Sequence, residues 1–518
     1  MNKILSILAL TVFIYTSCKK DEDLTMPRLF RPVSVGALTA DSNTIEASWQ
    51  PIAGATGYEV AISRDTFRTI DMSVTVDTSA AAIKKLFFNQ LYQVQVKALA
   101  RDTTKNSMWS NLGAVKTLSS IFRTPGVNDI TLNSVRARWV TKGAPVTSIK
   151  VVKRSDKSVV ATVTLSATDL TNEYVVINGL DASTQYTMYL YSGNDERGFV
   201  DFSTKAPFTG TIIDLTVITG RPGVLADTIP QVPSGSTILL SRGETYTISS
   251  AITLDKSLTI MSKPDLTNPI KARIYFTSNF EFKAGATIDQ IEFNDVYLVS
   301  DNYTSRYVIN NGNSANIGRV VFNESRIEIF RGMFRLKDNG TNISELIINN
   351  CVVDSIGNYS VININASSKI DNITITNSTI YKVEGVIASA SAANLVTVSD
   401  CTFNEAPLGN NKNVYFDFGT INISNGFNIT NCIFGTGKVS GGANTVKDIK
   451  VGSSTAVGVI NSFKTTDHVT IPGGNEFQTL TSANRKSTEL WTAPYDGIFV
   501  IADATFTGRN SAGDPRWR

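Results

Sequence analysis

Apolar and polar residues alternate along residues 27 to 208 in short runs that are separated by turn residues. Alternation with a period of two predicts half-buried β-strands. One run ends in Trp49 and a later one in Trp139, and each is followed by a Leu-x5-Tyr segment, which ends in Tyr92 or Tyr186. The pattern recurs at close to the roughly 100 residues of one immunoglobulin-like sandwich, so it predicts two successive β-sandwich domains.

A different pattern begins near residue 211, where short apolar stretches each end in Asn, Asp or Glu. These polar residues recur at irregular intervals of about 23 to 31 positions, the length of one solenoid coil with loops of varying size. They are Asp295, Glu324, Asn350, Asn377, Asp400 and Asn431. Because one coil cannot bury its apolar face alone, we expect equivalent positions to stack on coils about 4.8 Å away.

The repeat predicts a structural role for these polar residues. An Asn or Asp at a corner tolerates the left-handed backbone conformation and can bond the equivalent side chain of the next coil. We therefore expect a polar ladder, followed one residue later by a buried column of small residues and three residues later by a buried apolar column. The small column is Val296, Ser325, Cys351, Ser378, Cys401 and Cys432. The apolar column is Ile327, Val353, Ile380, Phe403 and Phe434.

Both parts of the chain resemble known folds. The Trp and Leu-x5-Tyr pattern resembles that of fibronectin type III domains, in which the Trp fills the core and the Tyr bonds back to the backbone. The stretch from Gly235 to Ile260 resembles the entry coils of pectate-lyase-like parallel β-helices. The expected fold class is all-β: fibronectin type III-like sandwiches at residues 27–119 and 120–208, then a right-handed parallel β-helix (pectin-lyase-like) with a C-terminal cap at 209–518.

The N-terminal residues predict export and lipid anchoring. Lys3 precedes an apolar stretch, Ile4–Tyr15, which is too short for a permanent membrane span and is typical of a removable signal peptide. The residues before Cys18 resemble the lipobox of bacterial lipoproteins, and the acidic residues after it resemble a surface-export signal of Bacteroidetes. We expect a signal peptide at residues 1–17 and an acidic linker at 18–26 that begins with lipidated Cys18. An ordinary secreted protein is the alternative.

The C-terminal run Gly-Asp-Pro-Arg-Trp, residues 513 to 517, resembles the end of a domain family of unknown function. That family occurs in Bacteroidetes lipoproteins associated with polysaccharide utilisation and often follows fibronectin domains. We expect Trp517, Arg516 and Arg518 to cap the last coil and hide its open edge.

Composition and charge narrow the function. The net charge is +3 and the sequence has no long basic run, which argues against nucleic-acid binding. No later segment approaches about 18 consecutive apolar residues, so we expect no transmembrane span. The three cysteines other than Cys18 are an odd number and fit the buried small column, which argues against disulfides and against a metal site.

Proteins of the resembled β-helix fold usually place their sites on the outer face of one sheet. Five inward residues set the register of such a face: Ile309, Phe334, Ile362, Ile387 and Phe416. By alternation the next residues point outward, namely Asn310, Arg335, Asn363, Ala388 and Asp417, with Lys337 and Asn365 two positions beyond Arg335 and Asn363. A cationic strip with amide groups suits a uronate carboxylate and sugar hydroxyls. An ordinary solvated sheet face is the alternative.

Aromatic residues near the same loops are candidates for stacking on sugar rings, with core packing as the commoner role: Tyr303, Tyr307, Tyr359, Tyr381 and Tyr415. No catalytic set is visible, because the strip lacks an acidic cluster for Ca²⁺ and no pair of carboxylates stands out. His468, the one histidine, is expected at the surface or in a turn. We therefore expect no catalytic residue, no metal site and no cofactor, with Ca²⁺ left open.

Three functions remain open. The leading hypothesis is a lipid-anchored protein at the surface of the outer membrane that binds pectin-like or other acidic polysaccharide without catalysis. The second is a lyase or hydrolase of acidic polysaccharide that uses Arg335 or Lys337, and the third is a structural or adhesive scaffold. The expected partners are polysaccharide, the lipid of the outer membrane and other outer-membrane proteins of glycan uptake, but no nucleic acid.

Overall fold

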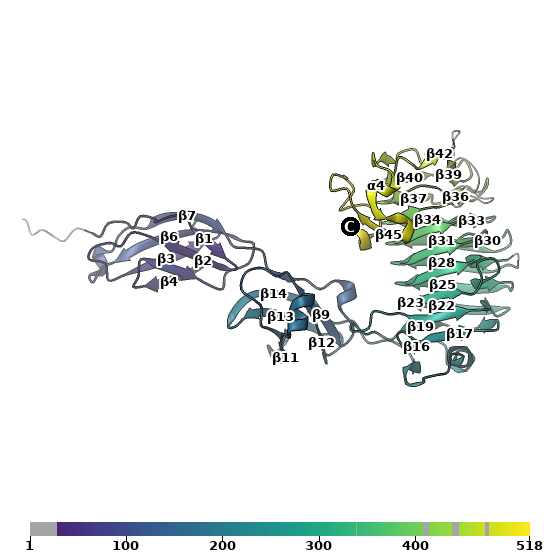
Figure 1. Ribbon diagram of the computed structural model, residues 1–518, viewed down its shortest axis with the longest axis horizontal. Helices are drawn as coiled ribbons and strands as arrows, with labels where there is room; N and C mark the ends of the chain where they lie inside the picture. The colour runs from purple at the N-terminus through teal and green to yellow at the C-terminus, as the bar shows by residue number, and fades with distance from the viewer. Residues whose placement is uncertain (1–27, 338, 408–413, 438–444, 472–475) are drawn as a thin grey trace, which may run out of the picture. The chain divides into compact units, whose positions relative to one another are not determined.

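The computed structural model describes residues 28–337, 339–407, 414–437, 445–471 and 476–518. The chain divides into two compact units, residues 1–206 and 207–518, and the all-β fold class is confirmed (Figure 1). The expected signal peptide, Cys18 and acidic linker lie outside the described residues. None of the described helices is long and apolar enough to cross a membrane.

The first sandwich contains two antiparallel sheets of orders β1-β2-β5 and β4-β3-β6-β7. Their strands are β1 (Thr39–Asp41), β2 (Thr44–Ser48), β3 (Gly57–Ser63), β4 (Met72–Val76), β5 (Ala80–Ile83), β6 (Leu91–Leu99) and β7 (Ser110–Lys116), with the short helix η1 (Thr103–Lys105). Trp49 lies in the core with 2% of its surface exposed. The hydroxyl of Tyr92 accepts a hydrogen bond from the backbone N–H of Phe87 at 3.1 Å, as the fibronectin-like pattern predicts.

The second sandwich repeats this plan with sheets of orders β11-β10-β13-β14 and β12-β9-β8. Its elements are β8 (Phe122–Arg123), η2 (Val127–Asp129), β9 (Ser134–Trp139), β10 (Ser148–Lys153), β11 (Val159–Thr164), α2 (Ala167–Asn172), β12 (Tyr174–Asn178), β13 (Gln185–Ser192) and β14 (Asp195–Ser203). Trp139 is 1% exposed, and the Tyr186 hydroxyl accepts a bond from the N–H of Asp181 at 2.9 Å. Both cores therefore have the predicted fibronectin-like form.

The second unit is a parallel β-solenoid with three sheets (Figure 1). The first sheet contains β15 (Ile212–Asp214), β16 (Ser236–Leu240), β19 (Leu258–Ser262), β22 (Ala286–Asn294), β25 (Ala315–Asn323), β28 (Asn342–Asn349), β31 (Lys369–Thr376), β34 (Leu395–Ser399), β37 (Phe427–Thr430) and β40 (Val457–Ile460). The second contains β17 (Thr245–Ile248), β20 (Ala272–Phe276), β23 (Val296–Ser300), β26 (Arg326–Phe330), β29 (Val352–Ile356), β32 (Thr379–Val383), β35 (Thr402–Asn404), β38 (Ile433–Phe434), β41 (Phe463–Lys464) and β43 (Thr481–Ser482). The third contains β18 (Ile252–Leu254), β21 (Phe280–Phe282), β24 (Tyr307–Asn311), β27 (Gly332–Leu336), β30 (Ile362–Ile364), β33 (Ile387–Ser389), β36 (Val414–Asp417), β39 (Thr445–Lys450) and β42 (Val469–Thr470). The short helices η3 (Leu215–Val217), α3 (Val224–Thr228) and η4 (Ile229–Gln231) lie near its start.

The predicted corner between the first and second sheets is confirmed. All six ladder residues have a positive φ, between 51° and 55°, and Asn461 with φ 44° extends the ladder by one coil. The small column is at most 2% exposed and the apolar column is fully buried. Side-chain bonds between ladder residues occur in the last coils, where Asn431 Nδ2 donates to Asp400 Oδ1 at 3.2 Å. In earlier coils the residue before the corner makes these bonds, as when Asn349 Nδ2 donates to Asn323 Oδ1 at 2.7 Å.

The C-terminal segment, residues 487–518, lies along the outer face of the second sheet, so the prediction that its end covers the last coil is wrong. It forms α4 (Ser487–Leu490), β44 (Trp491–Ala493), η5 (Pro494–Asp496), β45 (Ile498–Ile501) and η6 (Pro515–Trp517). Arg516 donates to Asn350 Oδ1 at 2.8 Å, Trp517 Nε1 to Thr379 Oγ1 at 2.7 Å, and Arg518 to Asp400 Oδ1 at 2.6 Å. The physical reason is that the corners of three successive coils supply acceptors there, while outward apolar residues of the second sheet pack against Trp491.

His468 is 4% exposed, so its expected surface position is wrong, although it does follow a turn. Its Nδ1 lies 3.0 Å from the carbonyl oxygen of Gly435, and its Nε2 lies 2.8 Å from Asp448 Oδ1. The two polar partners inside the last coils explain how an imidazole is buried there.

Candidate functional site

The outer face of the third sheet has the register that the sequence predicts. Asn310 pairs with Arg335, Arg335 with Asn363, Asn363 with Ala388, and Ala388 with Asp417. We call this series the outer column. It brings Asn310, Arg335 and Asn363 together, whereas Asp417 is separated from Arg335 by two coils. The sequence missed the next member, Lys450, which pairs with Asp417.

Lys337 and Asn365 lie one step farther along the same face. They follow Leu336 and Ile364, which are paired in neighbouring coils. The side chains of Lys337 and Asn365 are half-buried. The N–H of Asn365 donates to the carbonyl oxygen of Leu336 at 3.0 Å, which fixes the two side chains in adjacent coils. The predicted neighbours are therefore neighbours in the structure.

Two tyrosines hold the side chain of Arg335. Its guanidinium carbon lies 4.1 Å from the ring centre of Tyr359 and 5.6 Å from that of Tyr307. The guanidinium carbon of Arg331 lies 4.4 Å from the same Tyr359 ring. We call these four residues the tyrosine–arginine cluster. Cation–π contacts of this kind hold a guanidinium group in place while leaving its N–H donors for other partners.

Gly332 allows the cluster to form. It lies in β27 opposite Tyr307, and a Cβ at this position would approach Tyr359 Cβ to 2.8 Å and Tyr307 Cε1 to 3.2 Å. The two rings meet edge to face over it, with their centres 5.8 Å apart. A glycine is therefore required where the two tyrosines converge on the start of the strand.

The positive charge of the cluster is not neutralised within the described part of the chain. There, neither Arg331 nor Arg335 forms an ion pair with a carboxylate, and Arg331 Nε donates only to the amide oxygen of Asn358, at 3.1 Å. By contrast, neighbouring Arg306 pairs with Asp301 at 2.6 Å. Burial raises the pKa of Tyr307, and the charge of Arg335 acts in the opposite direction. The cluster is thus a cationic point on the outer face of the third sheet.

The amides beside Arg335 are less accessible than alternation predicts. Asn363 is only 9% exposed, because alternation sets the direction of a side chain while stacked coils about 4.8 Å away can still cover a short one. The oxygens Asn310 Oδ1 and Asn363 Oδ1 and the Nε of Arg335 are buried and have no hydrogen-bond partner among the residues that the structure describes. Buried polar atoms are usually paired, so this gathering of unpaired atoms marks the site as unusual.

The tyrosines are not the sugar-stacking surfaces that the sequence suggested. Tyr307, Tyr381 and Tyr415 are at most 5% exposed because they pack against neighbouring rings and inside the coils. Tyr303 is half-buried, and its hydroxyl donates to Glu384 Oε1 at 3.1 Å. Tyr359 is half-buried and contacts two guanidinium groups. Tyr303, Tyr307 and Tyr359 contact charged groups, whereas Tyr381 and Tyr415 pack against other rings.

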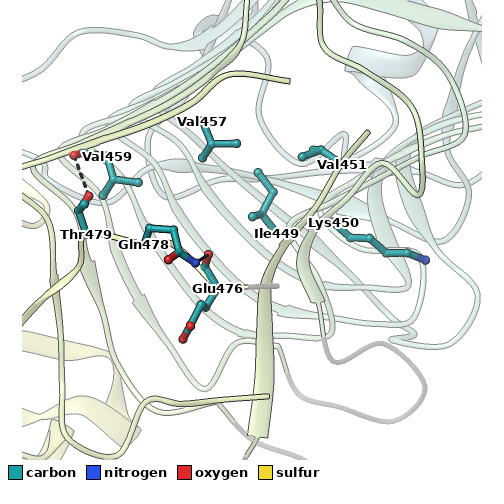
Figure 2. Close-up of a pocket in the computed structure, with 8 residues that line it drawn as sticks. All are labelled: Ile449, Lys450, Val451, Val457, Val459, Glu476, Gln478 and Thr479. Carbon is teal, nitrogen blue, oxygen red and sulfur yellow. Dashed lines mark hydrogen bonds between the residues drawn. The ribbon is translucent and has the colours of Figure 1, made fainter. Parts of the chain in front are cut away.

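A hollow of about 280 Å³ lies near the end of the solenoid (Figure 2). Figure 2 shows that the Lys450 side chain extends away from the apolar Val457 and Val459. The other residues that line the hollow are Ile449, Val451, Glu476, Gln478 and Thr479. Half of its lining residues are apolar, and the carboxylate of Glu476 opposes the positive charge of Lys450, so the hollow suits an acidic sugar less well than the tyrosine–arginine cluster does.

A second charged group, on the outer face of the second sheet, was missed by the sequence reasoning. Arg326 pairs with Glu328 at 2.5 Å and with Asp354 at 3.2 Å, and Tyr297 donates to Glu328. Burial, followed by the charge of Glu328, raises the pKa of Asp354 to about 6. The signal that could have found these residues is their outward position two and four residues after the ladder. The charges satisfy one another, so the group is suited to structure more than to ligand capture.

Nowhere among the described residues do three or more His, Cys, Asp or Glu side chains gather as a metal site requires.

Comparison with known proteins matches two parts of the solenoid to families. Residues 244–383 match a family described as a domain of unknown function (DUF4957). Residues 396–517 match another, also described as a domain of unknown function (DUF5123), and this match includes the Gly-Asp-Pro-Arg-Trp run. No curated protein matches the chain. Among solved structures, the crystal structure of chicken CNTN1 FN1-FN3 domains is similar over 35% of this chain and 68% of that chain, with 17% identity and a TM-score of 0.17.

Proposed function

We propose that the solenoid binds an acidic polysaccharide, of the pectin type, on the outer face of its third sheet and without catalysis. The observation that carries this proposal is the state of Arg335, which two tyrosine rings hold in place and which has no carboxylate partner among the described residues. A fixed guanidinium group with free N–H donors is suited to a carboxylate, which it can bind through two parallel hydrogen bonds.

The neighbours of Arg335 support a sugar ligand. Asn310 and Asn363 flank it in the adjacent coils, and their unpaired amide oxygens can accept bonds from sugar hydroxyls after a small side-chain movement. The outer column continues along the stacked coils to Lys450, so an extended polymer can follow it across several strands. Such a ligand would meet one coil about every 4.8 Å.

Two carboxylates in the coils around the tyrosine–arginine cluster, Asp301 and Glu384, favour binding without catalysis. Asp301 is paired with Arg306, and the buried Glu384 accepts a bond from Tyr303 at 3.1 Å. A general base for sugar cleavage must reach the reacting proton, whereas Asp301 is held in an ion pair and Glu384 is only 3% exposed. We therefore favour a binding protein over a lyase or hydrolase.

The proposal places the protein at the surface of the outer membrane, anchored by lipid at Cys18, in a Bacteroidetes-like polysaccharide-utilisation system. It rests on the signal-peptide and lipobox-like residues of the sequence. The fibronectin-like sandwiches would then act as spacers, and partner proteins of glycan uptake in the outer membrane would receive the captured chain.

Affinity electrophoresis tests the binding proposal. The mature chain carrying Cys18→Ser, which removes the lipid, is run in gels that contain polygalacturonate or a neutral glucan. We expect retardation only in the acidic gel, a loss of affinity of about 10- to 100-fold in Arg335→Gln, and no change in Arg319→Gln. Arg319 is the matched control because its charge lies on the first sheet, where it is paired with Glu345 at 2.8 Å. Unretarded migration of the unmutated protein in all gels would contradict the proposal.

A further inference from the structure

We propose that the tyrosine–arginine cluster binds two anionic groups of one ligand at once, with Arg331 as the second anchor. The preferred ligand is then a run of contiguous unesterified uronates, not a polymer with isolated acidic sugars. This inference rests on the proposed function and deepens it, since Arg331 was not among the residues that the sequence singled out.

The backbone fixes both arginines at one corner of the solenoid. Arg331 directly precedes β27, and its N–H donates to the carbonyl oxygen of Arg306 in the coil before, at 2.8 Å. The N–H of Tyr359 in turn donates to the carbonyl oxygen of Arg331 at 3.0 Å. Hydrogen bonds between successive coils therefore hold the Tyr359 ring beside Arg331, and Arg335 reaches the same ring from within β27.

The two charges repel each other until an anion arrives. Their guanidinium carbons lie 4.4 and 4.1 Å from one ring centre, so the two like charges are no farther apart than the sum of these distances, and they repel each other. The electron-rich ring offsets part of this repulsion. The carboxylates of the same corner do not, because Asp301 forms its ion pair with Arg306 and Glu384 accepts from Tyr303.

The free donors favour two carboxylates over one. Arg331 uses Nε on the amide of Asn358, and within the described residues the terminal Nη groups of both arginines contact no carboxylate. Each planar guanidinium group can therefore take a carboxylate in a bidentate arrangement. A ligand with one anionic group satisfies one arginine and leaves the other unpaired, whereas contiguous uronates neutralise both.

Titration calorimetry tests this inference on the mature Cys18→Ser chain at low salt. The probes are galacturonate, its unesterified dimer and trimer, the methyl-esterified trimer and a sulfated galactan oligosaccharide. We expect affinity to rise at least about 10-fold from monomer to di- or trimer, and this rise to disappear in Arg331→Gln. Arg331→Lys should keep part of the rise, because it keeps the charge but loses the planar fork. Arg306→Gln, the matched control, removes a charge at the same corner that is already paired and should keep the full rise.

Each outcome separates the two proposals. If the unmutated protein binds polygalacturonate but Arg331→Gln keeps the full rise, with an unchanged melting temperature, the second anchor is refuted and the binding function stands. If the monomer binds as tightly as the trimer, the same conclusion follows. Tighter binding of the sulfated oligosaccharide than of the trimer would overturn the choice of uronates. If the unmutated protein binds none of the acidic probes, both proposals fail.

Discussion

His468 and Asp448 form a buried pair whose disruption should destabilise the solenoid strongly. Their side chains are 0% and 1% exposed, and the second oxygen of Asp448 accepts the N–H of Phe477 at 2.9 Å. Since the carbonyl oxygen of Gly435 can only accept, Nδ1 of His468 must carry a proton, and one further proton lies between Nε2 and Asp448. The pair is thus neutral as a whole while each member depends on the other.

The substitution His468→Ala removes the donor from two buried acceptors, Asp448 Oδ1 and the carbonyl oxygen of Gly435. Breaking a buried charged pair by removing one partner costs about 3–5 kcal/mol, because the remaining group stays desolvated without compensation. Replacing both partners with apolar residues removes that penalty. The double variant His468→Leu with Asp448→Leu should therefore lose less stability than the single variants His468→Leu and Asp448→Leu lose together.

Scanning calorimetry is the suitable assay. The chain divides into two compact units, which we expect to unfold in separate transitions, so the sandwiches can act as an internal control. At about 2 °C per kcal/mol for a unit of this size, His468→Ala should lower the solenoid transition by roughly 6–10 °C. The reasoning is refuted if that transition shifts by less than about 2 °C, or if the double variant loses as much as both single variants together.

Two further predictions concern the second sheet and its covering segment. Burial and the charge of Glu328 raise the pKa of Asp354 to about 6, above its value in the unfolded chain, so the folded state binds the proton more tightly. The stability that this proton gives the folded state is present below about pH 4 and is lost, by up to about 3 kcal/mol, as the pH rises through about 6. Melting curves at about pH 4 to 7.5 should show this loss in the unmutated protein and not in Asp354→Asn. Arg516→Ala should remove the bonds to Asn350 and leave the buried Asp514 without its ion pair. We expect this to lower the free energy of unfolding by about 2 kcal/mol. Limited proteolysis should then cleave the C-terminal segment faster, and unchanged cleavage would contradict its role.

The sequence predicts most of what repeats in this fold. The corner ladder and the outer column could be placed because each follows from a periodic constraint, the left-handed corner in one case and alternation along a strand in the other. The positions of Asn310, Arg335 and Asn363 were therefore available before the structure. Their proposed role in glycan binding stays a prediction.

What does not repeat could not be predicted. Arg331 lies at a corner outside any alternating strand, so nothing in the sequence indicates that it shares Tyr359 with Arg335. The burial of His468 depends on Asp448, which is distant in sequence and carries no local signal. The C-terminal segment was misplaced because a terminal position suggested the end of the solenoid, whereas hydrogen-bond acceptors along earlier coils decide where it binds.

The position of the C-terminal segment has a consequence for the order in which the chain folds. We expect coils that begin near Asn350 to form as they are synthesised or exported. Tyr381, Ile433 and Phe463 on their outer face, however, pack mainly against residues from Leu490 onward. Until those residues arrive, a completed stack of coils carries an apolar strip that favours aggregation. A chain interrupted shortly before its last thirty or so residues would therefore hold nearly all of its coils and still be recognisable to quality-control proteases as unfinished.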